Sequence, residues 1–118
     1  MSRRDPLVAV QHMRDNALRV LTATQGRSRS DLDDDEMLEA ALIRWMEVIG
    51  EAARRVPNKF RARYPQVPWQ DTTDLRNVLI HGYDTIDLDE LWRITQEHLP
   101  PLMQQVQTII DENLPPKQ

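Results

Sequence analysis

Apolar residues recur every three or four positions between Met37 and Ala53, and no other feature of the sequence restricts the fold as strongly. This spacing places them on one face of a long helix, which must bury that face against other elements. Pro57 ends the helix, because proline lacks a backbone N–H and its ring collides with the preceding turn. Gly50 costs the helix about 1 kcal/mol relative to alanine, which predicts that another helix approaches closely there.

Two helix starts carry the same signature, an aspartate that can cap the helix and a glutamate three residues later. The first pair is Asp33 and Glu36, and the second is Asp87 and Glu90. Each pair is flanked by apolar residues that can pack together as a hydrophobic staple: Leu32 with Met37, and Ile86 with Leu91. We expect a helix to begin at each pair.

Prolines and glycines set the remaining boundaries. The first helix begins at Pro6 behind an Asp5 cap and ends near residue 24, and residues 58–64 form one short helical turn. The prolines at 65 and 68 require an extended segment, after which a helix is expected from about Gln70 to Gly82. The prolines at 100 and 101 must kink or break the last helix, so that a fifth piece runs to about residue 113.

No segment alternates apolar and polar residues with a period of two, so the sequence predicts no sheet. Its 118 residues suffice for one hydrophobic core. We therefore expect residues 1–118 to form a single all-α domain, an antiparallel bundle of four to five helices. The apolar stripes that carry Trp45 and Trp92 predict that both side chains lie in the core.

The composition excludes several classes of protein. Without cysteine there is no disulfide and no thiolate metal site. The chain has no uncharged apolar stretch of about 18 residues that could span a membrane. The arginines near the N-terminus are not followed by the apolar run of a secretory signal, so a soluble cytoplasmic protein is expected.

The net charge of −4 argues against nucleic acid, but the positive charges are unevenly distributed. Residues 1–63 hold 12 of the 15 lysines and arginines, and five of these fall within ten residues: Arg54, Arg55, Lys59, Arg61 and Arg63. Such a run either holds RNA phosphates or is a solvated segment that suits the negative end of the preceding helix. The sequence leaves both interpretations open.

Two patterns suggest metal binding, and neither is complete. Asp31, Asp33 and Asp35 match the first ligand positions of a helical calcium loop, but Glu36 and Leu42 stand where that loop requires glycine and glutamate. The three histidines, His12, His81 and His98, have no partners at metal-ligand spacing, and we expect His12 and His98 at the surface or its boundary. No metal and no other cofactor is therefore expected.

The segment from Arg76 to Tyr83 combines side chains that can carry chemistry. At about 100° per residue, Asn77 and His81 share a helix face and Arg76 lies one step round from Asn77. Imidazole, amide and guanidinium groups can together exchange a proton and hold a phosphate. The same residues also allow a purely structural interpretation. A positive charge on His81 would then interact favourably with the negative end of the helix dipole, and Gly82 would cap the C-terminus of the helix.

The pattern Arg76-x4-His81-x-Tyr83 resembles the signature of the HEPN superfamily, in the form found in the HepT toxin family. The resemblance covers nearly the whole chain, because four stretches agree in order. Residues 49–53 resemble the family's IGEA stretch, 64–69 its P-x-x-PW linker, 76–83 its RN-x-x-IHGY segment, and 87–100 its closing helices. Four matches at these spacings are far more specific than one.

The resemblance implies a metal-independent endoribonuclease that acts as a homodimer, with the Arg-x4-His sites facing a shared cleft. His81 is then the acid–base residue acting on the ribose 2′-hydroxyl, Arg76 stabilises the transition state, and Asn77 orients groups beside them. The product is a 2′,3′-cyclic phosphate. Glu51 and Arg44, seven residues apart on one helix face, are expected to form the polar wall opposite.

The resemblance also implies a partner, a minimal nucleotidyltransferase antitoxin that neutralises the toxin by binding it and by transferring AMP to Tyr83. The alternative is a helical subunit that scaffolds a nucleotidyltransferase and cuts nothing. The presence of both Arg76 and His81 argues against that alternative.

Overall fold

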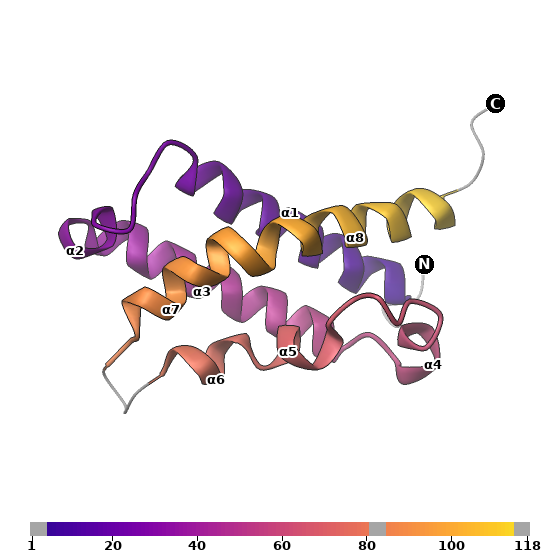
Figure 1. Ribbon diagram of the computed structural model, residues 1–118. Helices are drawn as coiled ribbons and strands as arrows, with labels where there is room; N and C mark the ends of the chain where they lie inside the picture. Colours follow the sequence, from indigo (N-terminus) through magenta and orange to yellow (C-terminus); the bar gives the residue numbers. More distant parts are fainter. Residues whose placement is uncertain (1–4, 81–84, 115–118) are drawn as a thin grey trace.

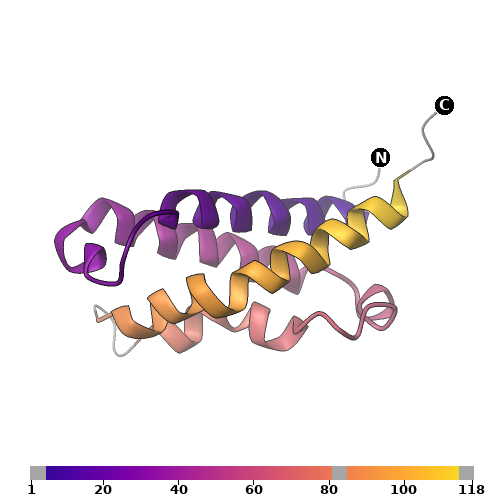
Figure 2. The ribbon, with the colours of Figure 1, turned by 45° about the horizontal axis from the view of Figure 1, so that its top comes forward.

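In the computed structural model, which describes residues 5–80 and 85–114, three long helices form the framework of the fold. They are α1 (Pro6–Thr24), α3 (Glu36–Arg54) and α8 (Leu99–Asn113), and α1 packs on both of the others. The short helices α5 (Trp69–Thr73) and α6 (Leu75–Leu79) run along the opposite side of α3 from α1 (Figures 1 and 2). Neighbouring elements run antiparallel, and the predicted all-α bundle is confirmed.

The core is built from the apolar stripes of the three long helices. Its fully buried side chains include Met13 on α1, Leu42, Met46 and Ile49 on α3, and Leu102 on α8. These residues and their neighbours form one continuous buried cluster. Trp45 and Trp92 pack against that cluster but are only half-buried, so the prediction that they lie in the core is met in part.

The predicted starts of α1 and α7 (Leu88–Arg93) are confirmed, whereas the predicted start of α3 is wrong. The Asp5 carboxylate accepts from the backbone N–H of Leu7 at 2.9 Å, and the Asp87 carboxylate accepts from that of Glu90 at 3.0 Å. The cap of α3 is Asp35 rather than Asp33; its carboxylate accepts from the backbone N–H of Leu38 at 2.9 Å.

Asp33 instead belongs to a separate turn, α2 (Asp31–Asp34). The turn begins where the Asp31 carboxylate accepts from the N–H of Ser28 at 2.7 Å. Asp35 then becomes extended (φ −127°, ψ 90°), which separates α2 from α3. Met37 is 84% exposed while Leu32 is buried, so the predicted staple between them does not form. The acidic residues thus cap and separate two helices.

The helix predicted from Gln70 to Gly82 is also wrong in detail. It divides at Asp74 into α5 and α6, and α6 ends at Leu79. The hydroxyl groups of Thr72 and Thr73 donate back to the carbonyl oxygens of Pro68 and Gln70, a bonding pattern that competes with the regular helix. Ile80 is extended and forms an isolated antiparallel bridge with Ile86; Gly82 lies outside the described residues.

The segment with the prolines at 65 and 68, predicted to be extended, instead forms turns, and Trp69 already begins α5. The remaining predicted boundaries agree with the structure. Residues Asn58–Arg61 form the short helix α4. The double proline interrupts the last helix without a break, because a wider π turn, η1 (Ile94–His98), joins α7 to α8. Both prolines then occupy the first turn of α8, where a missing N–H costs no intrahelical bond.

Gly50 explains how closely α5 approaches α3. A Cβ atom at this position would lie 3.2 Å from the Thr72 carbonyl oxygen and 3.3 Å from that of Thr73. Only the missing side chain allows this approach, so the predicted close contact at Gly50 is confirmed. Within residues 5–80 and 85–114, no helix is both long enough and apolar enough to cross a membrane.

Candidate active site

The exposed face of α3 carries Arg44, Glu47 and Glu51 on successive turns, and α6 borders this face. A cavity of about 240 Å³ lies between them, and we call it the motif-side cavity. It is lined by Arg44, Glu47, Gly50, Glu51, Arg54, Thr73, Arg76 and Asn77. The structure therefore brings together four of the residues predicted from the sequence: Arg44, Glu51, Arg76 and Asn77.

Arg76 reaches the face of α3 because the helix that carries it is anchored on both sides. Leu75 and Leu79, four residues apart, are both buried and hold α6 against the core. The close approach at Gly50 fixes the preceding helix, α5, against α3. As a result, Arg76 and Asn77 remain exposed on the outer side of α6, next to Thr73 and the α3 face.

Glu47 is a site residue that the sequence reasoning missed. Its carboxylate oxygen lies 3.4 Å from Nε of Arg76, and its side chain is 34% exposed where that of Arg76 is 63% exposed. This ion pair orients the guanidinium group along the cavity wall. The signal was present in the sequence, since Glu47 lies three residues after Arg44 and four before Glu51 and so shares their helix face.

The other charges of the cavity are unequally paired. The Glu51 carboxylate forms ion pairs with Arg54 at 3.2 Å and with Arg55 at 3.6 Å. Arg44, by contrast, has no ion-pair partner among the residues that the structure describes. None of the donors of its guanidinium group is therefore engaged by a carboxylate of the described residues, and all are available to an anion.

His81 and Tyr83 lie outside the described residues, and the contacts of the residues on either side of them locate the two ends of this part of the chain. Ile80 and Ile86 form the antiparallel bridge, and the backbone N–H of Asp87 donates to the Leu79 carbonyl oxygen at 2.9 Å. The chain thus leaves the end of α6 and returns to that same end. Residues 81–85, which include His81 and Tyr83 and which we call the motif segment, are thus bracketed by contacts at the end of the helix that carries Arg76.

The run of positive charges from Arg54 to Arg63 does not form one patch. Arg61 donates through Nη2 to the Ala53 carbonyl oxygen at 2.6 Å and through Nε to that of Val56 at 3.0 Å. Its guanidinium also lies 5.6 Å from the ring centre of Trp69. Arg61 therefore caps the C-terminal end of α3, where a positive charge also favours the helix dipole.

The other four residues of the run have different surroundings. Arg63 lies over the rings of Phe60 and Tyr64, at 5.4 and 5.6 Å. Lys59 is exposed on α4. Only Arg54 and Arg55 border the face of α3 that holds the candidate site. RNA binding by this run as a whole stays a prediction.

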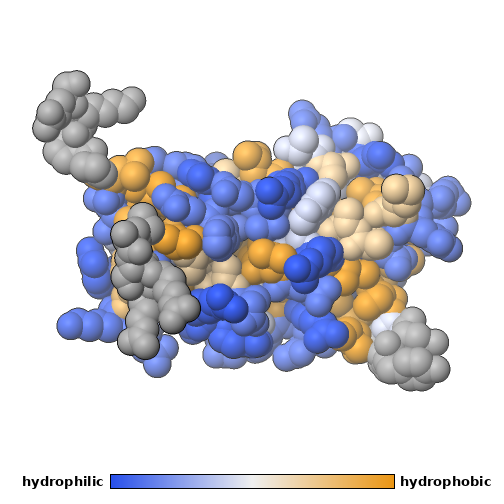
Figure 3. Space-filling model, turned by 180° about the vertical axis from the view of Figure 1, so that it is seen from behind, coloured by the Kyte–Doolittle hydropathy of each residue, from blue (hydrophilic) through white to orange (hydrophobic). Residues whose placement is uncertain are grey.

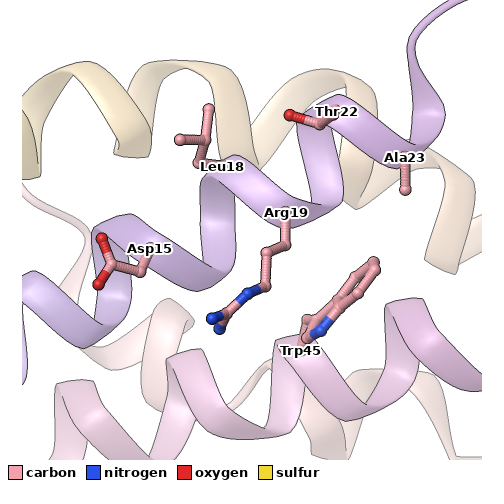
Figure 4. Close-up of a pocket in the computed structure, with 6 residues that line it drawn as sticks. All are labelled: Asp15, Leu18, Arg19, Thr22, Ala23 and Trp45. Atoms are coloured by element: carbon pink, nitrogen blue, oxygen red, sulfur yellow. The ribbon is translucent and has the colours of Figure 1, made fainter.

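Two other features could be mistaken for functional sites. His98 is half-buried and its Nε2 lies 3.1 Å from the Thr72 hydroxyl; burial lowers the pKa of this imidazole, and Asp71 partly opposes that effect. A cavity of about 500 Å³ lies between α1 and α3 and is mainly apolar (Figure 4). Arg19 from α1 and Trp45 from α3 both extend into the space between the two helices, while Leu18 points away. His98 has a structural contact, and this cavity lacks a cluster of catalytic groups.

No group of three histidine, cysteine or acidic side chains capable of holding a metal ion occurs in the part of the chain that the structure describes. The motif-side cavity offers guanidinium, amide and carboxylate groups instead. Such a set can bind an anion and stabilise developing negative charge.

A family model described as ribonuclease HepT-like matches residues 13–109, which include Arg44, Glu47, Glu51, Arg76 and Asn77. The chain belongs to the ribonuclease HepT-like family. The family predicted from the sequence is thereby confirmed.

Several relatives agree with this HepT-like assignment. The protein named "Putative RNase MJ1380" from Methanocaldococcus jannaschii is 36% identical over 109 residues, which cover 92% of this chain and all of the relative. "Probable ribonuclease HepT" from Thermococcus cleftensis is 38% identical over 68 residues, 58% of this chain and 62% of that one. "Putative RNase TTE0752" from Caldanaerobacter subterraneus subsp. tengcongensis is 29% identical over 107 residues, 91% and 96% of the two chains. No solved structure matches this HepT-like chain.

Proposed function

We propose that this protein is a metal-independent endoribonuclease whose active site is the motif-side cavity together with the motif segment beside it. The observation that carries the proposal is the meeting of Arg76 and Asn77 with Arg44, Glu47 and Glu51 in one cavity. Membership of the ribonuclease HepT-like family supports RNA as the substrate. The rest of the mechanism follows from the chemistry of these groups.

In the proposed reaction, His81 removes the proton of a ribose 2′-hydroxyl, and the 2′-oxygen attacks the adjacent phosphorus. The bond from phosphorus to the 5′-oxygen of the next nucleotide breaks, and that oxygen gains a proton. The products are a 2′,3′-cyclic phosphate and a free 5′-hydroxyl. Arg76 balances the charge on the phosphorane-like transition state, and Glu47 holds the guanidinium in place through the 3.4 Å ion pair. Asn77 orients groups beside them.

The experiment that tests this proposal is cleavage of RNA by the purified protein in EDTA. Wild type should cleave, because the mechanism needs no metal. His81→Ala should lose activity by a factor of about 100 or more, since a positioned acid–base group contributes roughly that much. The circular dichroism of the mutant should remain helical. Equal cleavage by wild type and mutant would overturn the assignment of His81, and an intact protein that never cleaves would favour a scaffolding subunit.

We further propose that the protein is the toxin of a toxin–antitoxin pair and works as a homodimer in the cytoplasm. Its partner would be a minimal nucleotidyltransferase that transfers AMP to Tyr83. A tyrosine is a poor base at neutral pH because its ordinary pKa is near 10, so we assign Tyr83 to regulation rather than to catalysis. A bulky anionic group there would compete with RNA phosphate for Arg76.

The division of labour between His81 and Tyr83 can be measured directly. Tyr83→Phe should keep cleavage within about threefold of wild type, because phenylalanine preserves the ring and removes only the hydroxyl. Mass spectrometry after co-expression with the nucleotidyltransferase should find added AMP on wild type and none on Tyr83→Phe. A phenylalanine mutant as inactive as His81→Ala would place Tyr83 in the chemistry, and AMP on Tyr64 would contradict the modification site.

A further inference from the structure

A second polar cavity lies on the other flank of the same α3 face, toward α1. It has a volume of about 250 Å³, and we call it the α1-side cavity. It shares Arg44, Glu47 and Glu51 with the motif-side cavity. The residues it adds are His12, Val48, Ala52 and Arg55. The two cavities therefore flank the same three side chains of α3, and we call the pair, taken together across the exposed face of α3, the groove.

The charges along this groove favour an extended anion. Four arginines line it, Arg44, Arg54, Arg55 and Arg76, against two carboxylates, Glu47 and Glu51, so its net charge is 4 − 2 = +2 before His12 is counted. This local excess stands out on a chain whose net charge is −4. Clustered charges hold phosphates through the local field, whatever the sign of the total.

The pairing of these charges points to Arg44 as the link between the two cavities. Glu47 is engaged by Arg76, and Glu51 by Arg54 and Arg55. Arg44 lines both cavities and has no ion-pair partner within the described residues. Its five N–H donors can therefore turn to either side. A phosphate at Arg44 would lie between Arg76 on one flank and Arg55 on the other.

His12 completes the far end of the groove. It is exposed on α1, and its imidazole is the only polar group that α1 adds to the α1-side cavity. His12 precedes residues 13–109, the part of the chain that the family model matches. The far end thus repeats the kinds of side chain found at the motif, an arginine with an imidazole, without the Arg-x4-His spacing.

We propose that the α1-side cavity is a second phosphate-binding subsite, in which His12, Arg44 and Arg55 hold a non-scissile phosphate of the same single RNA strand. This inference rests on the proposed ribonuclease function, because it assumes that the scissile phosphate lies at Arg76. The strand then crosses α3 from the motif-side cavity to α1. Figure 3 views the molecule from behind and shows hydrophilic side chains over much of this side, with apolar patches exposed among them.

The test separates binding from cleavage by using RNA whose 2′-oxygens are methylated, since such an oxygen cannot attack phosphorus. The ligand is a 2′-O-methyl oligouridine of about eight nucleotides. Arg44→Gln should bind it about tenfold or more weakly than wild type does. Arg55→Gln and His12→Gln should each bind it about threefold more weakly, as expected when phosphate contacts are lost. Arg19→Gln, which removes an exposed arginine of α1 outside the groove, is the matched control and should stay within about twofold of wild type. In Arg55→Gln the plot of log affinity against log salt should flatten by about 0.7, the value for one single-strand contact.

A ligand that carries only one phosphate makes the binding test specific for the second subsite. The 2′-O-methyl dinucleoside monophosphate UpU fills only the motif-side cavity, so wild type, Arg55→Gln and His12→Gln should bind it equally. The inference is overturned if Arg55→Gln and His12→Gln bind the oligonucleotide as wild type does, or if they lose affinity for UpU to the same extent. If wild type itself binds neither RNA and cleaves none, the proposed function fails with it, whereas cleavage with unchanged subsite variants rejects the second subsite alone.

Discussion

The C-terminal end of α3 and its exposed middle face are both rich in arginine, and the two regions use the guanidinium group in opposite ways. At the end of the helix, Arg61 donates to the carbonyl oxygens of Ala53 and Val56, at 2.6 and 3.0 Å, and so satisfies the helix itself. At the middle face, Arg76 reaches in from α6, is 63% exposed, and among the described residues has its ion pair with Glu47, through Nε. Backbone partners make an arginine structural, and an open cavity leaves it free to bind a ligand.

This comparison shows that a count of positive charges along the sequence does not say which arginines are open to a ligand. The densest run, Arg54 to Arg63, contains a helix cap and an arginine stacked on two rings. The cation at the centre of the candidate site, Arg44, is separated from that run in the sequence and has no other charged residue within two positions of it. Whether an arginine is structural or open to a ligand depends on which atoms its guanidinium group contacts.

The largest expected difference between the two regions is in catalysis. Arg76→Lys should reduce kcat/KM for RNA about 100-fold or more, because lysine keeps the charge but loses the planar fork that grips a phosphate. The melting temperature should change little, since Arg76 is exposed and its ion pair with Glu47 is solvated. Steady-state kinetics and thermal unfolding on the same preparation give both numbers.

Arg61→Lys should behave in the opposite way and serves as the matched substitution. It should unfold at a lower temperature than wild type and cleave RNA at a similar rate while folded. If Arg61→Lys loses cleavage as severely as Arg76→Lys, the division between a structural and a catalytic arginine does not hold.

The next effect is on stability. Arg61→Gln should lower the free energy of unfolding by roughly 1.5–3 kcal/mol, because it removes charge-assisted hydrogen bonds to two carbonyl oxygens at the end of α3. Urea unfolding followed by circular dichroism measures this change. Lys59→Gln, two residues away and exposed on α4, should change the free energy of unfolding by less than about 0.5 kcal/mol. Equal effects at the two positions would mean that the cap adds nothing beyond general charge.

The sequence predicted well whatever depends on local spacing. The apolar stripe of α3, the caps at Asp5 and Asp87, and the shared face of Arg44 and Glu51 all follow from the helical repeat. The close approach at Gly50 was also predictable, because an unfavourable residue inside a strong helix calls for a packing reason.

The predictions that failed depend on contacts between distant residues or on competition among equivalent ones. Asp33 and Asp35 can both cap a helix, and the choice of Asp35 follows from the separate turn that residues 31–34 form. The division of the 70–82 helix follows from Thr72 and Thr73, whose hydroxyls bond back to the chain while their carbonyls lie against α3. The cap that Arg61 supplies bears out, for this residue, the interpretation that the run suits the negative end of α3. Helix periodicity does not identify Arg61 as the donor, because it lies eight positions beyond its acceptor.

The smallest expected effect concerns Gly50, where α5 packs closely against α3 between the two regions. At Gly50 an added Cβ would lie 3.2 Å from the Thr72 carbonyl oxygen, so in Gly50→Ala the backbone of α5 must move away by a few tenths of an ångström. The gain in helix propensity, about 1 kcal/mol, offsets much of the packing cost, and the free energy of unfolding should fall by about 1 kcal/mol or less. Because α6 follows α5 directly, Arg76 should shift relative to Glu47, and cleavage should fall by a factor of about 3 to 10, as small displacements of catalytic groups do. The contacts of Arg61 with Ala53 and Val56 do not involve α5 and should be unaffected.

Gly26→Ala is the control, because Gly26 has a φ of 75° and nothing within 4 Å of an added Cβ. It should strain the backbone and lower stability while leaving cleavage by the folded protein unchanged. If Gly50→Ala cleaves as fast as wild type, the closeness of α5 to α3 does not position Arg76, and the middle face of α3 owes its geometry to the anchoring of Leu75 and Leu79 alone.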